Sequence, residues 1–218
     1  MKASVVIVTY RRMEYLKEIV KAWTDQCLDV WLCDCSEDGI PFDHSGFNYV
    51  HFVPDPGNKV RHAVATLSKG DIVIKADDDI MPLPGLVDDF IRAHKHLGED
   101  CVTGIHGRTF DGPDYYRDTI MYVANKQKVP KRVDFLGVIT CSPRKFLAMD
   151  LRGCHSPIED LYWHNHTYPD VPKYVISTNQ FDNYLPESKD AGRLCAGKEE
   201  RKLRQEYYMK IYLRKYKK

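Results

Sequence analysis

Apolar runs alternate with amphipathic stretches along the first half of the chain. Short apolar runs rich in β-branched residues predict buried strands at 3–8, 30–33, 49–53 and 71–76. Between them, apolar residues at helical spacing predict helices at 12–23 and 58–67, the second capped by Asn58. This alternation predicts an α/β fold with a mainly parallel sheet flanked by helices.

The second half of the chain is less regular. Its pattern predicts a helix over 82–97, strands at 101–105, 133–141 and 173–177, and helices that begin at the Ser-Pro pairs 142–143 and 156–157. Polar stretches at 106–118 and 180–193 are typical of loops. No internal repeat or linker is visible, so we expect one domain over 1–197 and a distinct segment over 198–218.

That segment, 198–218, combines charge with aromatic residues. It holds nine Lys or Arg, three Glu and several interleaved Tyr, as expected for a basic C-terminal helix. Two interpretations remain open. The tyrosines pack on the domain, or the basic face contacts phosphates of an anionic membrane or of nucleic acid.

Composition narrows the class of protein. With 218 residues, 43% of them hydrophobic, and a net charge of +1, the chain suits one globular domain and is not polybasic. No apolar stretch approaches the ~20 residues of a membrane span, and the first apolar run is too short for a signal sequence. We therefore expect a cytoplasmic protein with no transmembrane segment, and leave peripheral membrane attachment open.

Cysteine usage agrees with a reducing compartment. Seven Cys is an odd number without the spacing of a disulfide framework. Cys33 and Cys35 share one face of a predicted strand, where buried thiols are the simpler interpretation. A metal site there would require further ligands, such as Cys27.

Polar clusters follow three of the predicted strands, at 9–11, 34–38 and 77–79. In parallel α/β sheets, ligands bind beyond the carboxyl ends of the strands, so these clusters are expected to converge. The acidic triplet 77–79 is the most informative, because adjacent like charges repel unless a cation relieves them. Asp77 and Asp79 lie on one side of an extended segment, and their hard oxygen ligands favour Mg²⁺ or Mn²⁺.

With these motifs in place, the sequence resembles the GT-A glycosyltransferases, especially the inverting family 2. The resemblance runs from about residue 3 to 167. It rests on the opening strand at 4–11 (SVVIVTYR), on 57–63 (GNKVRHA) with the DxD motif in 69–80 (KGDIVIKADDDI), on 133–137 (VDFLG) with 142–146 (SPRKF), and on Glu159-Asp160. It implies a GT-A, Rossmann-like sheet and transfer of a sugar from a nucleotide sugar, with UDP as the expected nucleotide.

The resemblance also implies site residues. Nucleotide-sugar contacts fall on Thr9, Tyr10, Arg11, Asp34, Arg61, Asp77 and Asp78. Asp79 and Asp77 hold Mn²⁺ or Mg²⁺, and Asp160 is the general base that deprotonates the acceptor hydroxyl. Candidate acceptor or phosphate contacts are His106, Arg108, Gly137, Glu159, Trp163, His164 and His166. Core packing or a plain surface position is an alternative for the histidines, Trp163 and Arg108.

Other functions remain open at this stage. A nucleotidyltransferase shares the sheet and an acidic metal site but favours a glycine-rich phosphate loop, and this chain has no glycine before Gly39. A non-catalytic glycan- or nucleic-acid-binding module is the third hypothesis. The acceptor is either an envelope or polysaccharide glycan or a hydroxymethylated DNA base.

Overall fold

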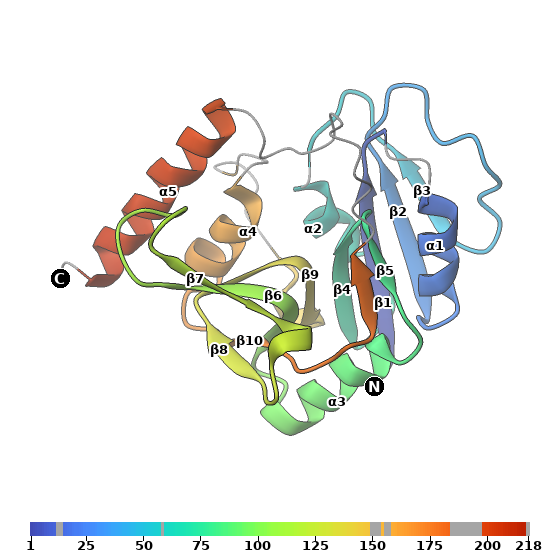
Figure 1. Ribbon diagram of the computed structural model, residues 1–218. Helices are drawn as coiled ribbons and strands as arrows, with labels where there is room; N and C mark the ends of the chain where they lie inside the picture. The colour runs from blue at the N-terminus through green and yellow to red at the C-terminus, as the bar shows by residue number, and fades with distance from the viewer. Residues whose placement is uncertain (12–14, 58, 149–153, 155–157, 184–197, 217–218) are drawn as a thin grey trace.

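A mixed sheet forms the centre of the molecule, with strand order β3-β2-β1-β4-β9-β6-β10-β8 and β7 paired to β6 (Figure 1). The computed structural model describes residues 1–11, 15–57, 59–148, 154, 158–183 and 198–216. The strands of this sheet are β1 (Ala3–Thr9), β2 (Asp29–Asp34), β3 (Asn48–His51), β4 (Ile72–Asp77), β6 (Val102–Phe110), β7 (Thr119–Val123), β8 (Lys131–Val133), β9 (Phe135–Pro143) and β10 (Lys173–Val175). A separate pair joins β5 (Ile80–Pro82) to β11 (Phe181–Asn183).

The first half of this sheet is parallel. Strands β3, β2, β1 and β4 run in one direction, whereas β9 is antiparallel to both β4 and β6. The carboxyl ends of β1, β2 and β4 therefore lie at one edge, as the alternating pattern predicts. The α/β fold class predicted from the sequence is confirmed.

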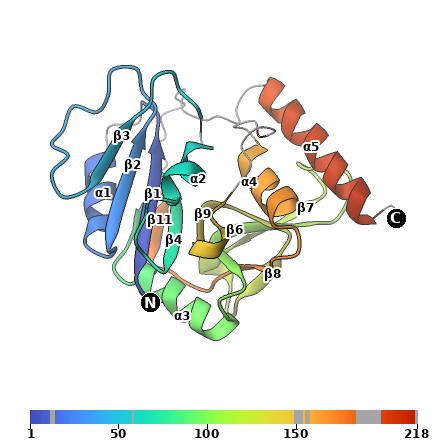
Figure 2. The ribbon, with the colours of Figure 1, turned by 180° about the vertical axis from the view of Figure 1, so that it is seen from behind.

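Helices cover both faces of the sheet. They are α1 (Leu16–Thr24), α2 (Val60–Ala65), α3 (Leu86–Leu97), α4 (Glu159–Tyr162) and α5 (Lys198–Tyr216), with 3₁₀ turns at Ala124–Lys126 and Arg144–Phe146 and a π-helical turn, η4 (Trp163–Thr167), continuing α4. In β1, Val5 and Ile7 join the core formed with α1 and α3, whereas Val6 and Val8 join the core under α2. Figure 2 shows α2 on its face of the sheet from behind. Burial on both faces explains the uninterrupted apolar run that opens the chain.

Three expectations about the second half need correction. Residues 106–110 belong to β6 and not to a loop, β9 continues through Ser142 and Pro143 where a helix start was expected, and 181–183 form a strand. The expected cap at Asn58 and the Ser-Pro pair at 156–157 lie outside the described residues. Among the described helices, none is long and apolar enough to cross a bilayer.

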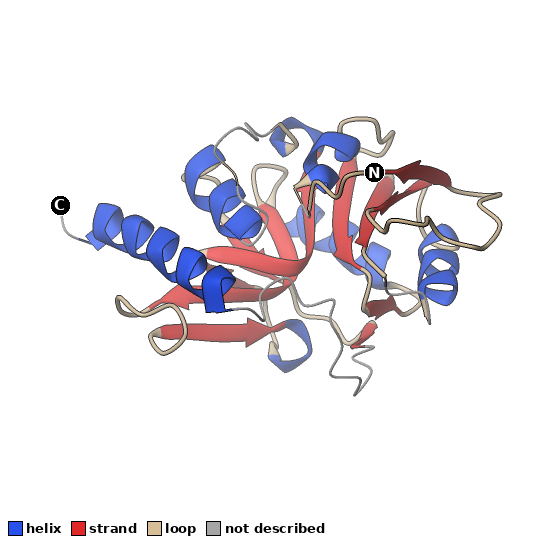
Figure 3. Ribbon diagram, turned by 90° about the horizontal axis from the view of Figure 1, so that it is seen from above, coloured by secondary structure: helices blue, strands red, loops and turns tan. Residues whose placement is uncertain are grey.

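Helix α5 packs against the end of the sheet farthest from α1 (Figures 1 and 3). Its residues Tyr208 and Ile211 join a buried cluster with Phe110, Tyr115 and Phe135. Tyr208 Oη donates a hydrogen bond to the Gly112 carbonyl at 2.5 Å. The aromatic side of α5 thus faces the protein, while basic residues such as Lys202 and Lys210 are exposed.

Candidate active site

The ends of three parallel strands bring together the polar clusters predicted from the sequence. Thr9 pairs with Asp34 between β1 and β2, and Val8 pairs with Asp77 between β1 and β4. The expected convergence of these segments is confirmed by this register.

The acidic triplet forms the turn between β4 and β5. Asp77 ends β4, Asp78 and Asp79 form the turn, and Thr9 Oγ1 donates a hydrogen bond to Asp78 Oδ2 at 2.8 Å. Burial raises the pKa of Asp77 to about 7, and the neighbouring Asp79 and Asp78 add to the increase, although Arg61 opposes it. A cation at this turn would relieve the repulsion that these carboxylates share.

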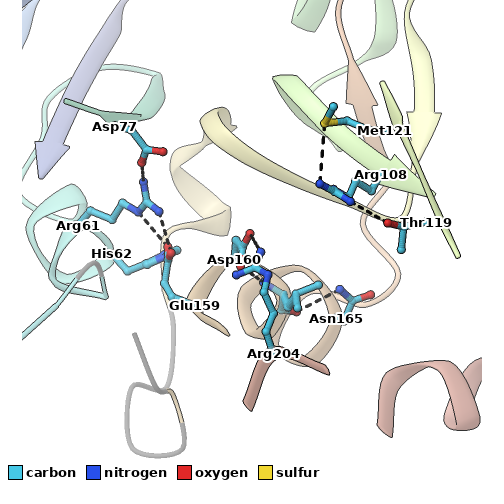
Figure 4. A network of polar contacts seen from close by, with 11 residues as sticks. Arg61, His62, Asp77, Arg108, Thr119, Met121, Glu159, Asp160, Asn165 and Arg204 are labelled. Atoms are coloured by element: carbon cyan, nitrogen blue, oxygen red, sulfur yellow. Dashed lines mark hydrogen bonds and ion pairs between the residues drawn. The ribbon is translucent and has the colours of Figure 1, made fainter. Parts of the chain in front are cut away.

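Arg61 connects this turn to Glu159, the first residue of the Glu159-Asp160 motif (Figure 4). Its Nη1 donates to Asp77 Oδ1 at 2.8 Å, while Nε and Nη2 donate to Glu159 Oε1 and Oε2 at 2.9 and 2.7 Å. Burial lowers the pKa of the Arg61 guanidinium, but Glu159 and Asp77 outweigh that effect and keep it charged. Arg61 is only 7% exposed and holds the carboxylates of Asp77 and Glu159 together, while the nucleotide-sugar contact predicted for it stays a prediction.

Glu159 is likewise a buried structural anion. His62 Nε2 lies 2.5 Å from Glu159 Oε1, which makes Nε2 the protonated nitrogen of a neutral ring. Burial lowers the pKa of His62 to about 4, with Lys75 contributing. Burial raises the pKa of Glu159, but Arg61 and His62 outweigh it and hold that pKa below its usual range. The acceptor contact predicted for Glu159 does not agree with this burial.

Asp160, the next residue, faces another way. A Cβ added to Gly137 would lie 3.5 Å from Asp160 Oδ2, so the carboxylate lies over the start of β9. Arg204 Nη2 of α5 donates to Asp160 Oδ2 at 2.5 Å, and the side chains of the pair are 11% and 17% exposed. The guanidinium of Arg204 also stacks on Tyr115, with Cζ 4.9 Å from the ring centroid. The C-terminal helix therefore holds the candidate base in place.

Strand β6 lines the side of the site opposite the Asp77–Arg61 network (Figure 4). His106 pairs with Gly137 across β6 and β9, and the carboxylate of Asp79 acts on its pKa, although burial is the larger effect and lowers that pKa. Arg108, two residues further along, donates from Nη1 to Thr119 Oγ1 at 2.9 Å. Both side chains are partly exposed, so both predicted contacts remain accessible to a ligand.

Beneath the site lies a buried polar layer. Lys75 Nζ lies 2.9 Å from the centroid of the Trp163 ring, and His164 packs against the same indole. A cavity large enough for about one water molecule is lined by these three residues together with Asp160 and Gly137. Trp163 and His164 are almost fully buried, which agrees with the core-packing alternative considered for both, whereas His166 is exposed against Tyr162.

The loops after β1 and β2 carry the residues predicted to contact the nucleotide. Tyr10 is half-buried, and the exposed Arg11 pairs with Glu37 at 2.9 Å. Asp34 is fully buried: Oδ1 accepts from the Ser36 amide at 2.9 Å and Oδ2 from Tyr49 Oη at 2.8 Å. Asp34 thus supports its loop, and the nucleotide-sugar contact predicted for it stays a prediction. Thr9 is also buried and supports the acidic turn.

Among the described residues other than glycine, two adopt positive φ angles, and both border the site. They are Arg11, at φ 57°, and Val138, at φ 67°, which follows Gly137 and lines the cavity beside Asp160. Left-handed backbone is unfavourable for a β-branched residue. Strained residues of this kind concentrate where the surrounding structure maintains a functional geometry.

The acidic turn fits a metal that is completed by substrate oxygens. Over the described ranges, no three His, Cys, Asp or Glu side chains converge as a metal-binding cluster. A closed protein cage is therefore not formed by those residues. Mg²⁺ and similar ions are commonly held by one or two carboxylates plus substrate phosphates. Asp79 and Asp77 can supply the carboxylates.

The strand-end loops, the acidic turn and a carboxylate facing it across β9 define the GT-A class of glycosyltransferases. The sequence matches Glycosyl transferase family 2 over residues 4–150, and the chain belongs to that family. It is accordingly a glycosyltransferase, which decides against the nucleotidyltransferase and the non-catalytic module. Members of this family typically use a nucleotide-sugar donor and a divalent metal.

A likeness to the solved structure of TarS supports the fold. Staphylococcus aureus TarS, residues 1–349, is similar to this chain with a TM-score of 0.56 and 16% identity, over 83% of this chain and 59% of that one. A197 from STIV gives a TM-score of 0.48 and 17% identity, over 81% of this chain and 82% of that one. No curated protein matches the sequence. These likenesses concern the fold alone.

Three side chains of the site were not predicted from the sequence: Lys75, Tyr115 and Arg204. A lysine inside an otherwise apolar strand run was a visible signal for Lys75. Arg204 is one of nine basic residues in its segment, and nothing in the local sequence distinguishes it.

Proposed function

We propose that this enzyme transfers a sugar from a UDP-sugar to an acceptor hydroxyl with inversion, with Asp160 as general base and Mn²⁺ or Mg²⁺ at Asp79 and Asp77. The supporting observation is the placement of Asp160. It lies against Gly137, whose strand partner His106 is within the electrostatic influence of Asp79. With the base on one side of the site and the acidic turn on the other, the acceptor hydroxyl can attack C1 of the donor sugar from the face opposite the leaving diphosphate.

On the donor side, Tyr10 and Arg11 are the accessible residues beyond β1. Tyr10 offers a ring face for the base, and Arg11 offers a guanidinium for the ribose or phosphates. A divalent metal would neutralise charge on the departing diphosphate. Asp78, held by Thr9, fixes the turn so that Asp79 projects from a rigid support.

On the acceptor side, Asp160 accepts the proton of the attacking hydroxyl. As the oxygen–C1 bond forms, the bond between C1 and the diphosphate oxygen breaks, and UDP leaves. Arg204 donates to Asp160 Oδ2 and the Leu161 amide donates to Oδ1 at 2.8 Å, and these two hydrogen bonds fix the orientation of the carboxylate. His106 and Arg108 border the same space from β6.

The test is release of UDP and transfer of sugar with a panel of UDP-sugars and Mn²⁺. Asp79→Asn should abolish metal-dependent UDP release. Asp160→Asn should lower transfer by a factor of ~10² or more and retain donor binding. Asp88→Asn, which changes an exposed carboxylate on α3, is the matched control. Full activity of Asp160→Asn would rule out the proposed base, and absence of UDP-sugar binding by folded wild-type protein would rule out the donor.

The acceptor is proposed to be either an envelope or polysaccharide glycan or a hydroxymethylated DNA base. The outer, basic side of α5 supports peripheral contact with an anionic membrane or with DNA. A cytoplasmic location agrees with both acceptors.

A further inference from the structure

Arg108 is a guanidinium held in place at the acceptor side of the site. Nη1 donates to Thr119 Oγ1 at 2.9 Å, and Nη2 lies 3.9 Å from Met121 Sδ. Its Cζ is 5.2 Å from the centroid of the Tyr115 ring. A side chain fixed from several directions has lost much of its rotamer freedom before any ligand arrives, which favours tight recognition.

Arg108 also differs from the neighbouring arginines in its charge environment. Arg204 pairs with Asp160 at 2.5 Å and Arg117 pairs with Asp114 at 2.9 Å. Over the ranges that the structure describes, no carboxylate lies within ion-pair distance of Arg108. A positive charge that the protein has positioned but not neutralised is available for an anion.

Its position relates this charge to the candidate base. Tyr115 is buried, and its ring contacts both Arg108 and Arg204, whose Cζ atoms lie 5.2 and 4.9 Å from the ring centroid. Arg204 in turn binds Asp160. Arg108 is therefore linked to the candidate base through Tyr115 and Arg204.

We propose that the acceptor carries a phosphate group close to its reacting hydroxyl, and that Arg108 binds this phosphate. The proposal rests on the function proposed above and specifies the acceptor's chemistry. The planar guanidinium matches phosphate oxygens through paired N–H donors, and such charge-assisted hydrogen bonds are the strongest in their class. The phosphate belongs either to a polynucleotide or to a phosphorylated glycan or polyol, and acceptor assays distinguish the two.

The first experiment uses inorganic phosphate as the probe on metal-free protein. Binding is followed by calorimetry and by the NMR signals of arginine side-chain Nε–H groups. Arg108→Gln should weaken binding about tenfold or more, since charge-assisted hydrogen bonds of ~1.5–3 kcal/mol are lost. Arg108→Lys should recover part of the affinity, and Arg92→Gln, an exposed arginine on α3, should leave it unchanged. Equal phosphate binding by wild type and Arg108→Gln, or none by wild type, would overturn the proposal.

The second experiment compares acceptors that differ only in phosphate. A hydroxymethylated oligonucleotide is set against the corresponding free nucleoside, and a polyol phosphate against the polyol. The wild type should show a KM at least about tenfold lower for the phosphate-bearing member of one pair. In Arg108→Gln, the KM values of the two members of that pair should become about equal. The pair that shows the ratio identifies the source of the phosphate. If the wild type uses the phosphate-free member of each pair as well as the phosphate-bearing member, the proposal is refuted. If the wild type shows no metal-dependent UDP release at all, the proposed function itself is refuted.

Discussion

The ion pair between Arg204 and Asp160 makes the C-terminal helix part of the candidate active site, and a double-mutant cycle tests this directly. The variants are Arg204→Gln, Asp160→Asn and the combination. Each single change removes the attraction between these two charges and keeps one of them, whereas the double variant removes both charges together.

The expected size follows from the burial of the pair. Removing one partner of a buried ion pair costs about 3–5 kcal/mol, and of an exposed one at most about 1 kcal/mol. The side chains of Arg204 and Asp160 are 11% and 17% exposed, so we expect about 2 kcal/mol for Arg204→Gln and a coupling energy of about 1–2 kcal/mol. In a chain of this size, 2 kcal/mol lowers Tm by roughly 4–8 °C.

Urea denaturation monitored by circular dichroism measures all four free energies of unfolding. Lys202→Gln is the control, because Lys202 pairs with Glu206 at 3.9 Å in full solvent, and its loss should not change stability measurably. If the effects of Arg204→Gln and Asp160→Asn simply add, the pair contributes no coupling. Helix α5 would then be held by its apolar packing and its other hydrogen bonds, such as that from Tyr208 to Gly112, and the argument for Arg204 as a positioning residue would fail.

Three further predictions concern the core around the site. Lys75→Met should raise the free energy of unfolding by about 1–2 kcal/mol, because it replaces a buried amine that has no described hydrogen-bond partner with an apolar group. A lower free energy of unfolding in urea would contradict this. Burial lowers the pKa of His94 to about 4, so the unfolded chain binds a proton between pH 6.5 and 4 that the folded chain does not. The free energy of unfolding should therefore decrease as the pH is lowered from 6.5 to 4, by at most about 3 kcal/mol. His94→Gln should flatten this pH dependence of Tm, and an unchanged slope would exclude His94 as its source. Gly70→Ala should destabilise by about 1–3 kcal/mol, because the new Cβ would lie 2.6 Å from the Ser4 amide nitrogen, and wild-type stability on thermal denaturation would show that β1 can shift.

The parts of the molecule that follow from short-range pattern were predictable. The run 3–8 is apolar because β1 is buried on both faces, and the acidic triplet follows β4 directly in the chain. Because topology places such strand ends together, the convergence of Thr9 with the acidic turn needed no information beyond the alternation of elements.

The loop prediction over 106–118 was wrong in its first part for a packing reason. The two glycines of that stretch, Gly107 and Gly112, favoured a loop, yet Gly107 lies within β6, as Gly104 does. A Cβ on Gly104 would lie 2.8 Å from the Ile139 carbonyl oxygen, and one on Gly107 would lie 2.7 Å from Val175 Cγ2. These glycines permit close approach between strands, and a single sequence does not separate that use from a turn.

Long-range ion pairing limited prediction of the site. Arg61 and Glu159 are 98 positions apart and Arg204 and Asp160 are 44 apart, so no local pattern indicated either pair. The motif singled out the carboxylate pair at 159–160, and the role of Asp160 stays a prediction. It did not show that one member would be buried by Arg61 while the other would face the site.

The separation between Arg61 and Glu159 also bears on how the enzyme acquires its activity during folding. Contacts between distant parts of a chain form slowly, because a long loop must close before they stabilise anything. Helices and the early parallel strands can form while the halves of the Arg61–Glu159 network are still apart. During refolding, the far-ultraviolet signal should therefore recover before the capacity to bind nucleotide and metal, and the delay between the two would measure the time needed to join the two halves of the site.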